Sequence, residues 1–588
     1  MGNQIIHMPN VTGAFMKRQW IALRPTQRIL LGVLVVACLF WLVALIQMAW
    51  QPIVADDELV YNSAVHWPDV PMRVNPPAYM SAVRLSFSIF GESVSSARLP
   101  GIAAGFASLF LIAAIVVRAL NHTDNSYLAA ALAVGLYALY PQAIQNMMFI
   151  DIDTAFLTAT LLGLVWVWLF IENRSRRVRV LVIALAFTLS LWVKLLSPFL
   201  TMGAIGLYLL LQGKWARVLE VMVATIIGFG VFLVTIQSNV TSQYLFGYTG
   251  GYMSRLNILE PENVRFILTV FPQAAGVVLL WFSIPMMILV AIAVLLSVKR
   301  WFSRQAMKAD FFLLYGALST VAYSMVILPA WGYPRYQAPF IPMLVLVAAM
   351  VVAPVLPKLN RASWGLVGIM AVICLIYNMV LVGDPMLRLY LLTYETTTEQ
   401  VGTRLSEGLI AFTRLLIPVV AAIVIGFVMA PRVRAKRADI LLVMLCAIAM
   451  GTYLTTSVTQ FEARYSTRYR YGLNLDDMLT ASQRIHDAVA PDGFVAAIDD
   501  VLFYTKRPGK GIYGLSTREN LMGGKTMTLA ELLRVQHVDA LAWTAKDAFR
   551  GSEMLNSSGV QHILDTCYDK EQYGKFVVYL NKQQTPCP

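Results

Sequence analysis

The first long apolar run reads ILLGVLVVACLFWLVALIQMAW and occupies residues 29–50. No charged side chain interrupts it, and a helix of this length crosses the roughly 30 Å hydrocarbon core of a bilayer. No short apolar core with a small-residue cleavage site precedes it, so we expect an uncleaved signal anchor rather than a removed peptide. The fold therefore starts from a membrane-spanning helix.

The composition extends this interpretation to the whole chain. Of the 588 residues, 58% are hydrophobic and 13% are charged, and the mean hydropathy is +0.64, whereas soluble domains carry about 25% charged residues. The net charge is +13, but the basic residues sit in short loops between apolar runs, which is typical of topogenic signals in membrane proteins. A soluble multidomain protein is excluded, and nucleic acid is not an expected partner.

Apolar runs of about 20 residues recur along the chain and predict about thirteen transmembrane helices. They lie near 29–50, 99–118, 127–141, 154–171, 180–193, 196–211, 219–237, 273–297, 311–329, 338–356, 364–382, 410–430 and 438–457. The expected fold class is a polytopic α-helical membrane protein of a bacterial inner membrane, with the lipid bilayer as its surroundings.

Lysine and arginine are concentrated in alternate loops, which orients the helices by the positive-inside rule. These residues are Lys17, Arg18, Arg24, Arg28, Arg174, Arg176, Arg177, Arg179, Lys299, Arg300, Arg304, Lys308, Arg432, Arg434, Lys436 and Arg437. All fall on one side in the thirteen-helix count, so we expect a cytoplasmic N-terminus, a membrane domain at 1–457 and a periplasmic domain at 458–588. Long loops are expected on the outer side at 51–98, named here the first outer loop, and at 238–272 and 383–409.

Beyond about residue 470 the chain changes to short alternating elements. We expect a polar helix at 476–489, strands at 494–498, 540–543 and 575–579, and a helix at 528–533. Strands that alternate with helices predict a small C-terminal α/β domain.

The five cysteines divide into two groups. Cys38, Cys374 and Cys446 fall inside apolar runs and are expected to be inert buried thiols. Cys567 and Cys587 lie in the tail, on the side predicted to be oxidising, where thiols of small domains tend to pair. We predict a disulfide between them, with two free thiols on a loose tail as the alternative.

Three adjacent carboxylates, Asp56, Asp57 and Glu58, follow the first apolar run. Neighbouring carboxylates repel one another and raise each other's proton affinity, which suits a general base or a cation site. A solvated start of the loop is the alternative interpretation.

Further charged residues lie at the expected outer ends of later spans. Asp151 and Asp153 precede the fourth span, where ionisable side chains are costly unless they are solvated or paired. Lys194 lies between the fifth and sixth spans, as a snorkelling cation or a ligand of an anionic phosphate. Arg335, flanked by aromatic residues before the tenth span, is expected to meet a lipid phosphate or to belong to an interfacial belt.

The motifs follow one another in a characteristic order. That order is the first-loop carboxylates, Pro76-Pro77, Phe90-Gly91-Glu92-Ser93, Ala97-Arg98-Leu99-Pro100, Asp153, Lys194, and Arg335-Tyr336 with Pro339 and Pro342. It resembles the GT-C membrane glycosyltransferases, in the branch that holds the aminoarabinose transferases of lipid A and the protein O-mannosyltransferases. The resemblance is clearest over residues 55–200 and returns at 333–342. Thirteen spans followed by an outer domain are also similar to the aminoarabinose transferases.

In that branch the first-loop motif reads Asp-Glu-Thr-Arg-Tyr, whereas this chain has Asp57-Glu58-Leu59-Val60-Tyr61. The resemblance therefore implies that Asp57 is the catalytic carboxylate. Two cations of the branch are missing, because Val60 replaces its arginine and Asn75 replaces the lysine of its Lys-Pro-Pro turn. These departures argue against aminoarabinose transfer to lipid A.

The remaining site residues are assigned by the same resemblance and by their charge. Glu58 and Asp153 join Asp57 as candidate catalytic residues, either orienting the acceptor or binding a divalent cation. Lys194, Arg335 and Arg255 are the candidate ligands of the donor phosphate. The candidate substrate-binding residues are Asp56, Tyr61, Asn75, Asp151 and Tyr336.

Together these features predict an inverting glycosyltransferase of the periplasmic face. It would move a sugar from a polyprenyl-phosphate donor to a hydroxyl or phosphate of an envelope lipid, glycan or protein. We assign no cofactor, and a divalent cation at Asp57, Glu58 and Asp153 is left open. A transporter or flippase for lipid-linked sugar is one alternative, but the charges gather at one face and no repeated halves are visible. A non-catalytic accessory protein that binds lipid-linked sugar is the other.

Overall fold

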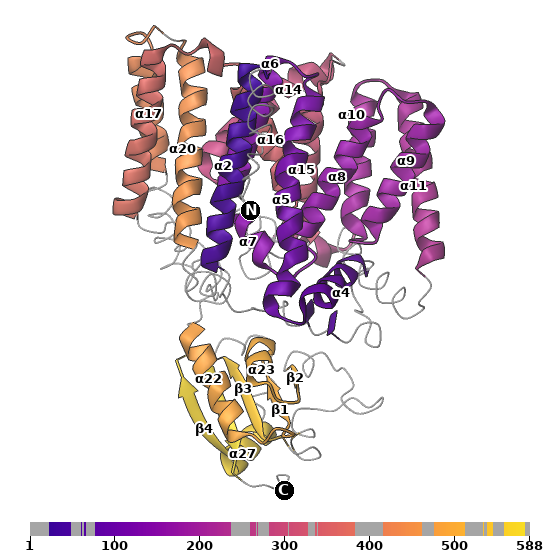
Figure 1. Ribbon diagram of the computed structural model, residues 1–588, viewed down its shortest axis with the longest axis vertical. Helices are drawn as coiled ribbons and strands as arrows, with labels where there is room; N and C mark the ends of the chain where they lie inside the picture. Colours follow the sequence, from indigo (N-terminus) through magenta and orange to yellow (C-terminus); the bar gives the residue numbers. More distant parts are fainter. Residues whose placement is uncertain are drawn as a thin grey trace, which may run out of the picture.

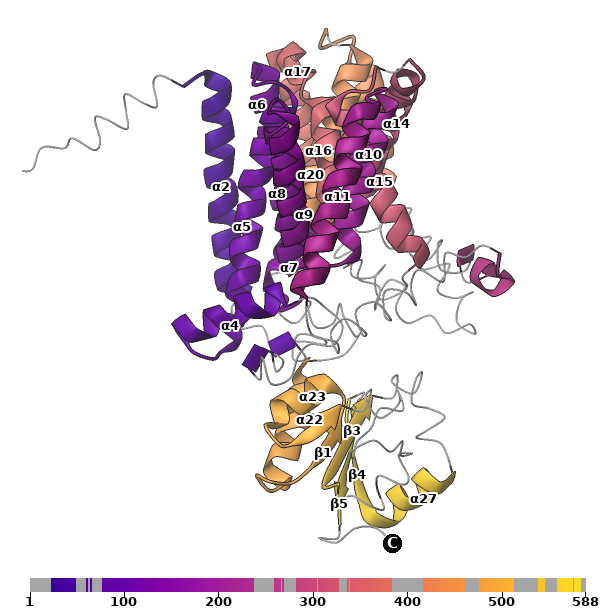
Figure 2. The same cartoon turned by 90° about the vertical axis from the view of Figure 1, so that its right-hand side faces the viewer.

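The computed structural model shows a bundle of long helices next to a small α/β domain (Figures 1 and 2). The description covers residues 23–48, 60–61, 64–65, 77–236, 259–265, 267–268, 282–303, 305–326, 336–337, 339–382, 416–434, 436–460, 475–511, 533, 538–544, 558–574 and 576–582.

Each of the thirteen predicted spans overlaps one described helix of the bundle. These helices are α2 (Pro25–Met48), α5 (Val94–Ala119), α6 (Asp124–Leu139), α8 (Ala155–Phe170), α9 (Arg176–Leu191), α10 (Leu196–Leu211), α11 (Trp215–Thr235), α14 (Ile284–Phe302), α15 (Lys308–Val326), α16 (Ile341–Val352), α17 (Arg361–Ile376), the helix Leu416–Met429, and α20 (Arg437–Gln460). Among the described residues, 7 helices are long and apolar enough to cross a membrane, or up to 8 if the bent pair α6 and α7 is one span. The chain is therefore a multi-pass membrane protein.

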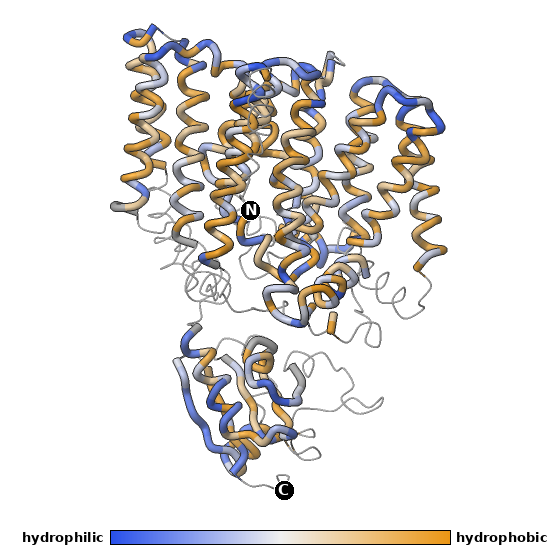
Figure 3. The backbone as a smooth tube through the Cα atoms, in the orientation of Figure 1, coloured by the Kyte–Doolittle hydropathy of each residue, from blue (hydrophilic) through white to orange (hydrophobic). Residues whose placement is uncertain are grey.

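The helices of the bundle are apolar over most of their length (Figure 3). Large aliphatic side chains are well exposed on their outer surface, such as Val36 (66%), Leu181 (64%) and Ile226 (69%). In water such a surface would be unfavourable, whereas lipid tails cover it at no cost. The helices are thus built for a hydrocarbon environment.

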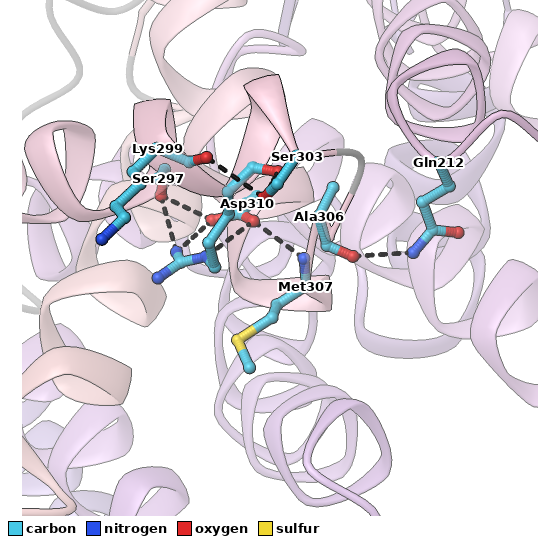
Figure 4. A network of polar contacts seen from close by, with 8 residues as sticks. Gln212, Ser297, Lys299, Ser303, Ala306, Met307 and Asp310 are labelled. Atoms are coloured by element: carbon cyan, nitrogen blue, oxygen red, sulfur yellow. Dashed lines mark hydrogen bonds and ion pairs between the residues drawn. The ribbon is translucent and has the colours of Figure 1, made fainter.

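The basic loops lie at the end of the bundle away from the α/β domain (Figures 1 and 3). One of them joins α14 to α15 and is organised by Asp310, which is fully buried. The Asp310 carboxylate accepts hydrogen bonds from the Met307 N–H (2.8 Å), from Ser297 Oγ and from the Arg300 guanidinium (Figure 4). A buried carboxylate needs such partners, so this ion pair stabilises the hairpin of α14 and α15 at the basic end of the bundle.

At the opposite end, two helices that the sequence did not predict lie near the domain (Figure 1). The short helix α4 (Ala78–Phe90) ends at Gly91, whose φ of 80° reverses the chain before α5. The helix α7 (Pro141–Met148) bends by 60° from α6. It lies so close to α5 that a Cβ on Gly105 would come within 2.2 Å of Met147 Sδ, so Gly105 is what permits this approach.

The C-terminal domain is a five-stranded mixed sheet in the order β2-β1-β3-β5-β4. Its elements are α22 (Leu475–Ala488), β1 (Val495–Ala497), α23 (Asp499–Thr505), β2 (Gly509–Gly511), β3 (Ala540–Thr544), α27 (Ser558–Cys567), β4 (Tyr568–Tyr573) and β5 (Phe576–Asn581). Strand β1 runs parallel to β2 and β3, whereas β5 is antiparallel to β3 and β4. The predicted α/β domain is confirmed, and β2 and β4 are additions to it. Of the helix expected at 528–533, only Leu533 is described.

A surface ion pair connects α22 to the edge strand β4. The Arg484 guanidinium donates to the Glu571 carboxylate at 2.7 and 2.9 Å, and the Tyr573 hydroxyl donates to the same group. The hydrogen bonds from Arg484 and Tyr573 lower the pKa of Glu571 below its ordinary value.

Candidate active site

The candidate site lies at the end of the bundle nearest the α/β domain. Three chain segments meet there: the turn before α8, the break between α9 and α10, and the residues that precede α16. Helix α7 leads into the first of them. Its proline opens the helix and all of its residues are buried, so the turn that follows is held inside the bundle.

Asp151 and Asp153 belong to this turn and are 8% and 5% exposed. The Asp151 carboxylate accepts a hydrogen bond from the Asp153 N–H at 3.3 Å, and the Thr154 hydroxyl donates to the Asp151 carbonyl. Such a bond from an aspartate side chain to the backbone two residues on is an Asx-turn. The turn uses the backbone N–H of Asp153 and not its carboxylate, which makes a separate contact with Lys194.

Asp153 forms an ion pair with Lys194 across 41 residues of sequence. The Lys194 ammonium lies 2.8 Å from Asp153 Oδ2, and the two side chains are 18% and 7% exposed. Beyond α9, the Lys194 N–H still donates to the Ser190 carbonyl at 3.1 Å, and α10 begins at Leu196. Lys194 therefore lies in the short break between two apolar helices.

The Lys194 ammonium also lies 5.9 Å from the centre of the Tyr336 ring, as in a cation–π contact. The structure therefore brings together three of the predicted site residues: Asp153, Lys194 and Tyr336. The Tyr336 ring stacks on Tyr323 of α15, with ring centres 6.4 Å apart and an interplanar angle of 11°. The Tyr323 hydroxyl lies 2.8 Å from Ser197 Oγ of α10.

Tyr323 and Ser197 were not predicted from the sequence, although both are polar side chains inside apolar runs. Both are buried, and their hydrogen bond joins α10 to α15 close to the segment that carries Lys194. Their contribution to the site is to fix the position of the Tyr336 ring. The signal that could have found them is a polar side chain inside an apolar run: Ser197 follows Lys194 by three residues, and Tyr323 directly precedes Ser324.

The middle of the first outer loop, where α4 begins, contacts the same region. The Ala78 N–H, directly after the Pro76-Pro77 turn, donates to the Trp192 carbonyl at 3.1 Å. The fully buried Tyr79 ring contacts Phe156 of α8 at 5.2 Å between ring centres. Helix α4 is thereby attached both to the segment that carries Lys194 and to the helix that follows Asp153.

Tyr61 lies between two other aromatic rings. Its ring centre is 5.2 Å from Phe87 of α4 and 5.6 Å from Phe503 of α23. The neighbouring Val60 is 1% exposed, so the position that carries arginine in the GT-C branch is buried here and carries no charge. The contacts of Tyr61 are packing contacts, and its role in substrate binding stays a prediction.

Several predicted site residues lie outside the described residues. They are Asp56, Asp57, Glu58, Asn75, Arg255, Arg335 and Cys587. Among the residues that are described, no cluster of three or more metal-ligating side chains is found, and Asp153 Oδ2 contacts the Lys194 ammonium. The divalent cation and the roles of these residues remain predictions.

Cys567 ends α27 and is 1% exposed. The free cysteines of the described chain are Cys38, Cys374 and Cys446, the three that were expected to be thiols. Cys567 is not among them. The predicted pairing with Cys587 is left to experiment.

The described cluster can bind an anion without carrying a large net charge. The Lys194 ammonium carries three N–H donors, and Asp153 Oδ2 accepts a hydrogen bond from it at 2.8 Å. The centre of the Tyr336 ring lies 5.9 Å from the same ammonium. A phosphate oxygen is the group that such a cation binds in a region close to hydrocarbon.

Comparisons with known proteins give the same picture of the fold. A family model described as dolichyl-phosphate-mannose-protein mannosyltransferase matches residues 74–240, and no curated protein matches the sequence. The chain is similar to a crystal structure of ArnT from Cupriavidus metallidurans bound to undecaprenyl phosphate, with a TM-score of 0.55 and 14% identity over 95% of this chain and 99% of that one. The chain is also similar to the apo structure of the same protein, with a TM-score of 0.53 and 15% identity over 93% of this chain and 97% of that one. The predicted GT-C fold is confirmed.

Proposed function

We propose that this chain is a membrane glycosyltransferase that uses a sugar linked to a polyprenyl phosphate. The observation that carries the proposal is the cluster of Asp153, Lys194 and Tyr336. It is supported by the fold, which is similar to that of an ArnT bound to undecaprenyl phosphate, and by the family model that matches residues 74–240.

The orientation follows from the basic loops. They lie at one end of the bundle, and the cluster and the α/β domain lie at the other. The positive-inside rule then puts the cluster and the domain on the extracytoplasmic face of the inner membrane. Nucleotide sugars are made in the cytoplasm, so a lipid-linked sugar is the donor that this face offers.

In the proposed reaction the donor enters from the outer leaflet with its phosphate beside Lys194 and Arg335. Asp57 accepts the proton of an acceptor hydroxyl while the oxygen of that hydroxyl attacks the anomeric carbon of the donor sugar. The bond from that carbon to the phosphate oxygen breaks, and polyprenyl phosphate leaves with its charge stabilised by the two cations. A single in-line displacement of this kind inverts the anomeric carbon.

The acceptor is an envelope lipid, glycan or protein, and the sugar is a hexose or a pentose. Val60 and Asn75 replace the two cations of the aminoarabinose transferases, and Val60 is buried. A donor pocket without these cations favours a sugar other than aminoarabinose.

The test is to incubate the purified protein with polyprenyl-phosphate sugars and an envelope extract, and to follow the release of free polyprenyl phosphate. Wild-type protein should release it, whereas a folded Asp57→Asn variant should not, because an amide cannot accept the proton. Release at the wild-type rate by that variant would remove Asp57 from the mechanism. Movement of intact lipid-linked sugar across vesicles without its cleavage would instead support a flippase.

A further inference from the structure

The α/β domain contacts the membrane bundle through two aromatic side chains of α23. Phe503 and Tyr504 both pack against the apolar core of the bundle, and Tyr504 also packs against the core of the domain. Their rings lie edge to face, with centres 5.1 Å apart. This pair of rings therefore connects two hydrophobic cores that are distant in sequence.

Tyr61 of the first outer loop lies at this junction. Its ring contacts Phe503 at 5.6 Å with an interplanar angle of 82°, and Phe87 at 5.2 Å with an angle of 62°. Phe87 is 7% exposed and belongs to α4, which is attached to the Lys194 segment through Ala78. The three rings form a continuous contact from the bundle through the first outer loop to the domain.

Helix α23 is attached firmly to the rest of its domain. The helix ends at Thr505, and the next residue, Lys506, has a φ of 50° that turns the chain. The Arg507 guanidinium then donates to the carbonyls of Val489 (2.8 Å) and His486 (2.6 Å), and His486 Nδ1 lies 2.8 Å from the Thr505 carbonyl. Phe503 consequently moves with α22 and the sheet and not as an isolated side chain.

We propose that the α/β domain positions the first outer loop for catalysis and that Phe503 is the positioning residue. This inference rests on the proposed function, because Asp57 lies only four residues before Tyr61. A general base must be held to within about 1 Å of its productive place, and a misplacement of that size costs about a hundredfold in rate. Tyr61 is the point at which the domain restrains the loop.

The experiment compares Phe503→Ala and Phe503→Leu with Phe503→Tyr, which keeps the ring. Tyr573→Ala is the matched control, because Tyr573 lies on the edge strand β4 and bonds to Glu571 of the same strand. For Phe503→Ala we expect kcat to fall about tenfold to a hundredfold, with the KM for the donor unchanged within about twofold. The kcat of Phe503→Leu should fall less than that of Phe503→Ala. Phe503→Tyr and the control should keep the wild-type kcat.

A second readout is independent of activity. Hydrogen–deuterium exchange of the peptide that contains residues 55–61 should be faster in Phe503→Ala than in wild type, and unchanged in Tyr573→Ala. Wild-type kcat together with wild-type exchange in Phe503→Ala would overturn the inference, as would a loss confined to donor KM. If Phe503→Ala does not fold, Phe503→Leu decides by the same two readouts.

The two hypotheses fail differently. If wild-type protein transfers no sugar from any donor, the proposed function fails, and the exchange of the loop then decides alone whether the domain restrains it. If wild type is active and Asp57→Asn is not, but Phe503→Ala behaves as wild type in both readouts, only the positioning role is refuted.

Discussion

Replacing Lys194 by Met separates the structural role of the ion pair from its role toward phosphate. The side chains of Asp153 and Lys194 are 7% and 18% exposed, and their charged atoms are 2.8 Å apart. Loss of the ammonium leaves a buried carboxylate without its cation, and breaking a buried pair in this way costs about 3–5 kcal/mol. Lys194→Met should therefore lower the thermal midpoint of the detergent-solubilised protein clearly.

The double variant Asp153→Asn, Lys194→Met supplies the control. It removes both charges at once, and replacing a buried pair by neutral groups is often close to neutral for stability. We expect it to recover most of the thermal midpoint, while its transfer rate stays about a hundredfold below wild type, because removing one group that stabilises a leaving anion has a cost of that size.

Two results would refute this reasoning. A single Lys194→Met variant as stable as wild type would mean that the ion pair contributes nothing to the fold. Wild-type turnover in the double variant would mean that the donor phosphate binds elsewhere. The measurements are thermal unfolding followed by tryptophan fluorescence and the release of polyprenyl phosphate under the same conditions.

Three further predictions concern other parts of the chain. Mass spectrometry of non-reduced, thiol-blocked protein should find the peptides of Cys567 and Cys587 linked, a bridge worth about 3 kcal/mol by loop closure; two alkylated thiols would contradict both the bridge and the periplasmic location. Gly105→Val should displace α7 and destabilise the protein by about 1–3 kcal/mol, whereas the same change at Gly163, which has open space, should be tolerated. The pKa of Glu571 is lowered by its arginine partner and by a tyrosine hydroxyl, so its contribution to stability is present above about pH 4.3 and is lost as the pH falls through the lower folded-state pKa. Glu571→Gln should weaken the dependence of the free energy of unfolding on pH below about pH 4.3. If that dependence is unchanged in the variant, the ion pair is too exposed to contribute to stability.

The helices could be predicted from the sequence because each apolar run must satisfy its own backbone in lipid. A run such as 29–50 has only one stable structure there, a helix, and α2 occupies it. Helix α7 was missed for the opposite reason. Its sequence, PQAIQNMM, mixes amides with apolar residues and reads as a polar loop, and its packing against α5, α2 and α20 makes it a buried helix.

The partners within the site could not be predicted. Asp153 and Lys194 were each singled out because a charge at the end of a span is costly, but they lie 41 positions apart in the sequence and nothing local indicates that they pair. Strand β4 shows the same limit, since YDKEQY lacks the alternation of a half-buried strand, and its place is set by the ladder with β5. Contacts across the chain, not local pattern, decide such elements.

The charges of the proposed site lead to one last test. Lys194 already neutralises Asp153, so a donor phosphate adds a negative charge to a pair whose net charge is zero, and Asp57 and Glu58 would add more. Placing like charges a few ångströms apart near hydrocarbon is costly, so further positive charge has to come from Arg335 or from a divalent cation. With arginine, transfer survives treatment with EDTA and is lost in Arg335→Ala. With a cation, EDTA abolishes transfer, added Mg²⁺ or Mn²⁺ restores it, and Arg335→Ala keeps most of its activity. Full activity after both treatments would contradict the placement of the phosphate beside Lys194.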